Sequence, residues 1–77
     1  MDWKAQLGTN VLRFRTQQGL SQQTLAGNAE LSLRYLAGVE RGEENPSLET
    51  IVAIADAMSI EPADLFAITC GDGIETT

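Results

Sequence analysis

The sequence predicts an all-α fold, a compact domain of five short helices. Apolar residues recur at spacings of three and four in consecutive segments, serine precedes three of these segments, and glycine follows two. No segment alternates apolar and polar residues between hairpin turns, as a strand would. At 77 residues the chain is expected to form one domain with one core, over residues 1–70. Residues 71–77 lack periodicity and are expected to be a flexible tail.

The first predicted helix runs from about residue 3 to residue 18, where Gly19 ends it. Its apolar residues fall on one face because they are spaced by four, four and three positions. They are Trp3, Leu7, Val11 and Phe14. This stripe is expected to pack in the core rather than to bind a cofactor or stack on a base.

Two shorter helices are predicted over about residues 22–28 and 33–41. Ser21 and Ser32 are suitable N-caps, since a serine hydroxyl accepts a hydrogen bond from a free N–H of the first helical turn. Gly42 is the natural end of the second of these helices. Two helices of this length joined by a turn of about three or four residues have the dimensions of a helix-turn-helix.

The last two predicted helices begin near Ser47 and at Pro62, a favoured first-turn residue. Before the fourth helix, Asn45 and Pro46 indicate a turn, and Glu49 complements the helix dipole. The apolar stripe of the fourth helix is Leu48, Ile51, Ile54, Ala55 and Met58. The fifth helix carries Leu65, Phe66 and Ile68.

The formal net charge of −6 taken alone argues against a nucleic-acid partner. The charges are unevenly placed, however. Residues 1–41 hold five basic and three acidic residues, a net +2, whereas residues 42–77 hold eight acids and no base. This division suits a protein that contacts DNA by one edge, and it also suits an acidic domain of another function.

Several kinds of chemistry are excluded by composition. The chain has no histidine and one cysteine, Cys70, so the usual zinc sites, an internal disulfide and Ser-His or Cys-His catalytic pairs are not available. We therefore expect no enzymatic activity, no metal and no cofactor. The N-terminus is neither basic nor followed by an apolar signal core, so we expect a cytoplasmic protein with no membrane partner.

A series of short motifs occurs in a fixed order from Leu7 to Phe66. They are Leu7-Gly8 with Val11, Phe14 and Arg15; Gly19-Leu20-Ser21-Gln22-Gln23-Thr24-Leu25-Ala26; Tyr35-Leu36; Val39-Glu40-Arg41-Gly42; Asn45-Pro46-Ser47-Leu48-Glu49-Thr50; and Asp64-Leu65-Phe66. With these residues the chain resembles the lambda-repressor-like helix-turn-helix family, the phage Cro and repressor type that includes xenobiotic-response-element-type regulators. The resemblance covers about sixty residues without a gap.

The resemblance implies that the helix predicted over residues 33–41 lies in the major groove of DNA. On a helical wheel Ala37, Gly38 and Arg41 lie within about 60° of Arg34, opposite the apolar residues Leu36 and Val39. Arg34 is the first choice for a base contact because a guanidinium can bond O6 and N7 of guanine together. Base contacts are expected at Ser32, Leu33, Arg34, Ala37 and Gly38.

Gln22 and Gln23 open the second predicted helix, where free N–H groups and the positive dipole end attract phosphate. They can equally be helix-start residues without a ligand, although the resemblance implies that Gln22 contacts phosphate and braces the recognition helix. Phosphate contacts are expected at Gln22, Gln23, Tyr35, Arg41 and Asn45. Arg41 has an alternative role, the neutralisation of Glu43 or Glu44.

By the same resemblance, Arg15 and Glu40 form a structural pair between the first and third helices. The sequence also departs from the family pattern. Glu30 stands in the turn where glycine is usual, which requires a left-handed or otherwise costly backbone. Ala37 and Gly38 leave the outward face of the third helix almost without side chains. This favours a close approach to DNA with specificity from an arginine, thymine methyl groups and DNA shape, or else a weakened affinity.

A homodimer is expected, because one copy contacts about one half-site and offers few basic residues. The alternative is a monomer in which the same apolar residues complete the core. A dimer would place two recognition helices about 34 Å apart on a near-palindromic operator. The expected interface is Ile51, Val52, Leu65, Phe66 and Ile68.

The resemblance implies a sequence-specific transcriptional regulator, a repressor or autoregulator, with a double-stranded DNA operator as its partner. A controller protein of a restriction-modification system fits the same pattern. The alternative is a protein-interaction module or antitoxin-like partner with weakened DNA binding, which acts on another protein through its acidic C-terminal half.

Overall fold

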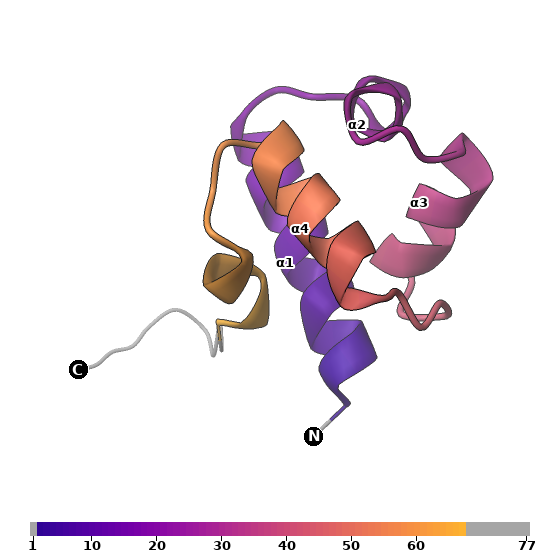
Figure 1. Ribbon diagram of the computed structural model, residues 1–77, viewed down its shortest axis with the longest axis vertical. Coiled ribbons are helices and arrows are strands. Elements are labelled where there is room, and N and C mark those ends of the chain that lie inside the picture. The colour runs from indigo at the N-terminus through magenta and orange to yellow at the C-terminus, as the bar shows by residue number, and fades with distance from the viewer. Residues whose placement is uncertain (1, 68–77) are drawn as a thin grey trace.

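The computed structural model describes residues 2–67, which form four α-helices followed by one 3₁₀ helix and contain no strand (Figure 1). The elements are α1 (Trp3–Gln17), α2 (Gln22–Asn28), α3 (Leu33–Glu40), α4 (Leu48–Ala57) and the 3₁₀ helix η1 (Pro62–Phe66). The predicted all-α class is confirmed. The predicted ends of α1 and α3 were each one residue too late, because Gln18 and Arg41 are their C-caps.

The prediction of five α-helices was wrong at the last element. Its backbone hydrogen bonds join residues three apart, from Asp64 N–H to the Glu61 carbonyl at 2.9 Å and from Ala67 N–H to the Asp64 carbonyl at 3.3 Å. Ala67 is already extended, with φ −64° and ψ 141°, so the segment is too short for a full α-helical turn to continue. Ile68, Cys70 and the tail predicted over residues 71–77 lie outside the described residues.

A serine or aspartate side chain fixes the start of every α-helix. Its oxygen accepts a hydrogen bond from a backbone N–H of the first turn, which would otherwise have no partner within the helix. The caps are Asp2 for α1, Ser21 for α2, Ser32 for α3 and Ser47 for α4. The three serine caps are those that the sequence predicted.

Each of the four α-helices is followed by its own turn, and the four turns have the same geometry. One residue after the C-cap adopts a positive φ, and the N–H of the following residue bonds to a carbonyl in the last helical turn, as Leu20 does to Arg15 at 3.0 Å. The positive-φ residues are Gly19 (72°), Glu30 (60°), Gly42 (77°) and Ser59 (57°). A left-handed or otherwise costly backbone was expected at Glu30, and the left-handed form is present.

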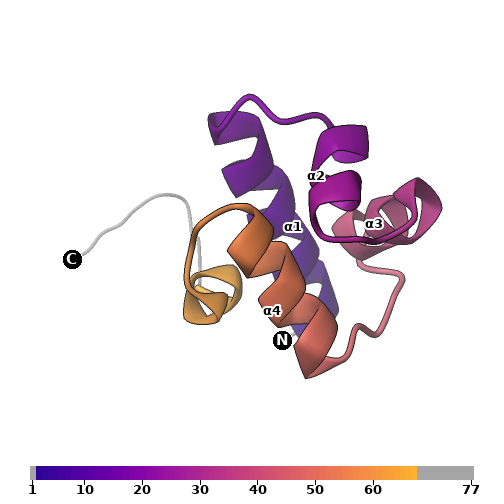
Figure 2. The same cartoon turned by 45° about the horizontal axis from the view of Figure 1, so that its top comes forward.

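The helices enclose one core. α1 packs against α3 and η1, while α2 packs against α3 and α4 (Figures 1 and 2). The buried apolar residues of this core are Leu7, Val11, Leu25, Ala26, Ala29, Leu36, Val39, Ile51, Ile54, Ala55, Met58 and Leu65. Trp3 departs from the prediction: it is exposed and lies against Phe66, with ring centroids 6.5 Å apart, because the first turn of α1 extends past the core.

α1 and α3 approach closely at Gly8. A methyl group on Gly8 would overlap the backbone carbonyls of Val39 and Glu40 and would lie 2.6 Å from the Glu40 oxygen. Glycine is therefore required at this crossing for reasons of space. This contact anchors the C-terminal end of α3 against the middle of α1.

Asn10 is a fully buried polar residue that the sequence did not single out. Its side-chain Nδ2 donates hydrogen bonds to the carbonyls of Leu65 and Ala67, both at 2.8 Å. Gln6 Nε2 donates to the same Ala67 carbonyl at 2.8 Å. Because these carbonyls lie at the end of η1, Asn10 holds that element on α1.

Candidate nucleic-acid interface

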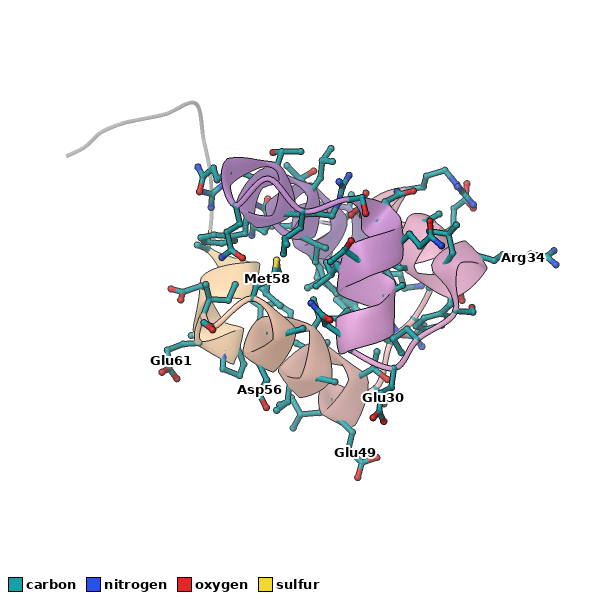
Figure 3. The ribbon with its side chains drawn as sticks, turned by 90° about the horizontal axis from the view of Figure 1, so that it is seen from above. Glu30, Arg34, Glu49, Asp56, Met58 and Glu61 are labelled. Carbon is teal, nitrogen blue, oxygen red and sulfur yellow. The ribbon has the colours of Figure 1, made fainter. Side chains whose placement is uncertain are left out.

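α3 has one side in the core and one side open to solvent. Leu36 and Val39 are fully buried, whereas Leu33 and Arg34 in the first turn are exposed. Figure 3 shows the Arg34 side chain pointing straight away from the helix. It forms no hydrogen bond or ion pair with any residue from 2 to 67, so its five N–H donors are available to a partner.

The start of α3 is open as well. Ser32 is exposed, and its hydroxyl accepts the N–H of Tyr35 at 3.0 Å, so the hydroxyl already caps the helix. Tyr35 is half-buried and packs against the core, which leaves only part of its ring at the surface. Ala37 is half-buried. Leu33 and Arg34 are thus the most accessible side chains at this end of the helix.

The expectation that Gly38 lies on an empty outward face was wrong. Gly38 is buried because the side chain of Glu44 lies against it. A methyl group on Gly38 would be 2.8 Å from both Cγ and Oε2 of Glu44. A base could therefore reach the Gly38 backbone only after Glu44 moved, so a direct base contact by Gly38 is not supported.

A hydrogen-bonded network joins α3 to α1 and α2 through the carboxylate of Glu40. Arg15 forms the implied ion pair with it, donating from Nε to Oε2 at 2.6 Å and from Nη2 to Oε1 at 3.1 Å. Gln22 Nε2 donates to Oε1 at 2.8 Å, and Arg15 Nη1 reaches the Leu20 carbonyl at 2.8 Å. The side chains of Arg15 and Glu40 are only 12% and 5% exposed, so the network is part of the interior.

Of the residues expected to contact phosphate, some are already engaged within the chain and others are exposed at the surface. The amide of Gln22 is directed to Glu40 and so braces α3, whereas Gln23 and Asn45 are exposed. Arg41 takes the alternative role, with its Nε 3.1 Å from Glu43 Oε1. Both partners are more than half exposed, so this pair is worth about 0–1 kcal/mol and is easily exchanged for a phosphate.

The residues expected at a dimer interface divide into two groups. Ile51 and Leu65 were assigned wrongly, because both are buried in the core of the single chain, with exposures of 4% and 0%. Val52 and Phe66 are exposed at 36% and 42% and can meet a second copy. Leu48, which belongs to the predicted apolar stripe of this helix, is 69% exposed, since it is the first residue of α4 and lies beyond the packed turns.

Four of the acidic residues lie away from Arg34. Asp56 on α4 and Glu61 before η1 lie on the opposite side of the molecule from the Arg34 side chain, and Glu30 and Glu49 point outward in a third direction (Figure 3). These four acids are separated in space from Arg34, whereas Glu43 and Glu44 follow α3 directly and lie beside it. Within residues 2–67, no helix is long and apolar enough to cross a bilayer, and no group of acidic or cysteine side chains is placed to hold a metal ion.

Comparisons of sequence and of structure with known proteins both identify relatives with a helix-turn-helix. The model of the helix-turn-helix family matches residues 11–65. The chain is 32% identical to the HTH-type transcriptional regulator y4dJ of Sinorhizobium fredii, covering 90% of each, and 35% identical to the control protein C.BamHI of Bacillus amyloliquefaciens, covering 80% of this chain and 78% of that one.

Solved structures agree with these sequence matches. The fold resembles the restriction-modification controller protein C.AhdI of Aeromonas hydrophila, with a TM-score of 0.80 and 44% identity over 82% of this chain and 96% of that chain. These three relatives are named as a transcriptional regulator, a control protein and a controller protein. The chain belongs to the helix-turn-helix family of DNA-binding transcription regulators.

Proposed function

We propose that the protein is a sequence-specific transcriptional regulator that binds a near-palindromic operator as a homodimer, with α3 in the major groove. The observation that carries this proposal is that α3 is anchored on one side and open to solvent on the other. Its reading residues Leu33 and Arg34 are exposed and unengaged, while its other side is held by the core and by the Glu40 network. A rigid helix with free donors is the arrangement that reading base edges requires.

The roles of individual residues follow from their exposure. Arg34 donates two hydrogen bonds to guanine, and Leu33 packs on a thymine methyl group. Ser32 and Ala37 lie close to the base edges, and the backbone at the start of α2 faces phosphate. Gln23, Tyr35, Arg41 and Asn45 contact the DNA backbone. Arg41 releases Glu43 to do so.

The controller proteins among the relatives favour one form of this function. Two of the similar proteins are named as control or controller proteins, and their chains are close in length to this one, as the 78% and 96% coverage shows. The protein is proposed to act in the same way, as a repressor or autoregulator near its own gene or as the controller of a restriction-modification system.

Fluorescence anisotropy on duplexes tiled across the region upstream of the gene tests this proposal. Wild type is expected to bind one tile tightly and to lose affinity steeply as salt rises. Arg34→Ala should weaken that tile by about 1–3 kcal/mol. Arg34→Lys is the matched control, because it keeps the charge but cannot form the bidentate pair, so it should keep non-specific affinity and lose specificity.

A second function has support from a different surface. Leu48 and Val52 form an exposed apolar strip on α4, flanked by the acids Glu49 and Asp56. Such a surface suits a protein partner, as an interaction module or antitoxin-like protein would require. If no tile binds more tightly than random DNA, autoregulation is excluded, and binding to a co-encoded protein becomes the function to measure.

A further inference from the structure

We infer that Glu44, from the loop after α3, is a specificity-determining residue that accepts a hydrogen bond from a cytosine amino group in the operator. The inference rests on the proposed function, since it requires α3 to lie in the major groove. Its basis is the contact in which the Glu44 side chain covers Gly38. The loop thereby supplies a side chain at a position where α3 itself has none.

The contact places Glu44 on the reading face of α3. Gly38 follows Arg34 by four residues, about one helical turn, so the two positions share a face. Oε2 of Glu44 lies 2.8 Å from the position that a Gly38 Cβ would occupy. The face therefore presents a guanidinium in its first turn and a carboxylate in its second.

Gly38 is explained by the same contact. Glycine lowers the stability of a helix, and Gly38 has a negative φ, so backbone conformation does not require it. A methyl group at this position would meet Cγ and Oε2 of Glu44 at 2.8 Å, so the Glu44 side chain would have to move away. Gly38 thus permits the Glu44 carboxylate to lie directly on the helix.

The carboxylate of Glu44 is available to a ligand. It forms no hydrogen bond or ion pair with any of the residues 2–67, while its neighbour Glu43 pairs with Arg41. A carboxylate is only an acceptor. In the major groove it matches cytosine, which presents only its N4 amino donor, whereas guanine and thymine present acceptor atoms that repel it and adenine presents the acceptor N7 beside its amino group.

Selection of half-sites from a randomised duplex library by the full chain tests the inference. Wild type is expected to enrich cytosine at one position of each half-site beside the guanine read by Arg34. Glu44→Gln should lose about tenfold of this discrimination, because an amide both donates and accepts. Glu43→Gln is the matched control: it removes the same charge one residue away and should keep the cytosine preference.

Gly38→Ala provides a second variant in which all charges remain. Its methyl group displaces the Glu44 carboxylate, so it should lose the same cytosine preference. Melting temperatures of all variants establish that they are folded. A thymine replacement of the selected cytosine should weaken wild type about tenfold and Glu44→Gln only slightly.

Two results would overturn the inference in distinguishable ways. If Glu44→Gln and Glu43→Gln tighten binding to all duplexes alike and the base preference is unchanged, Glu44 contributes only its charge, and the regulator proposal stands. If wild type enriches no sequence at all, the proposed function fails and the role of Glu44 fails with it.

Discussion

Glu30 ends α2 in a left-handed conformation that a residue with a Cβ adopts at a cost of about 1 kcal/mol. Ser59 ends α4 in the same way, with φ of 57°. These two residues form a matched pair, since the same backbone turn follows both helices. They differ in position and charge: Glu30 lies in the turn between α2 and α3, and Ser59 lies in the connection to η1.

Replacing either residue with glycine is expected to raise the free energy of unfolding by about 0.5–1 kcal/mol, because glycine relieves the left-handed strain. Urea unfolding monitored by circular dichroism measures the change. Glu30→Gly should also tighten DNA binding of all sequences, since it removes an acid beside α3, while Ser59→Gly should not. Destabilisation by Glu30→Gly alone would mean that its charge at the start of α3 outweighs the backbone strain.

At the scale of elements, the packing of α1 on α3 depends on the absence of one methyl group. Gly8→Ala is expected to lower the free energy of unfolding by about 1–3 kcal/mol, because the new Cβ overlaps the carbonyls of Val39 and Glu40. Operator affinity should fall as well, since the same end of α3 carries the Glu40 network. Thermal unfolding and anisotropy check the two effects.

Gly27 provides the contrasting case for that experiment. It lies within α2, and nothing is within 4 Å of the place where its Cβ would be. Gly27→Ala is therefore expected to raise the free energy of unfolding by up to about 1 kcal/mol through helix propensity alone. Equal destabilisation by the two alanine variants would contradict the close approach of α1 and α3.

At the scale of the whole molecule, function is proposed to require two copies. Val52→Glu should weaken the dimer at least about tenfold, because it places a charge in an apolar contact, and operator affinity should fall with it. Sedimentation equilibrium measures the association. Leu12→Glu is the matched control, since Leu12 is exposed on α1 outside the proposed interface. A wild-type protein that stays monomeric at high concentration would refute the dimer.

The positions of the α-helices could be read from the sequence because their signals are local. Ser21, Ser32 and Ser47 cap within three residues of themselves, and apolar spacing identifies the inward face of each helix. The 3₁₀ form of the last element was missed, since Pro62 starts either kind of helix. The exposed position of Arg34 followed from the same helical periodicity.

What the sequence alone determined, then, is the class of fold, the boundaries of the first three α-helices to within one residue, the start of α4, a costly backbone at Glu30 and the exposed position of Arg34. Only the tertiary structure decided which apolar residues are interior: it buried Ile51 and Leu65 and exposed Leu48. It also assigned Asn10 to hold η1 and placed Glu44 on Gly38. These contacts join residues from separate elements, and helical periodicity specifies the face of a helix but not its neighbour.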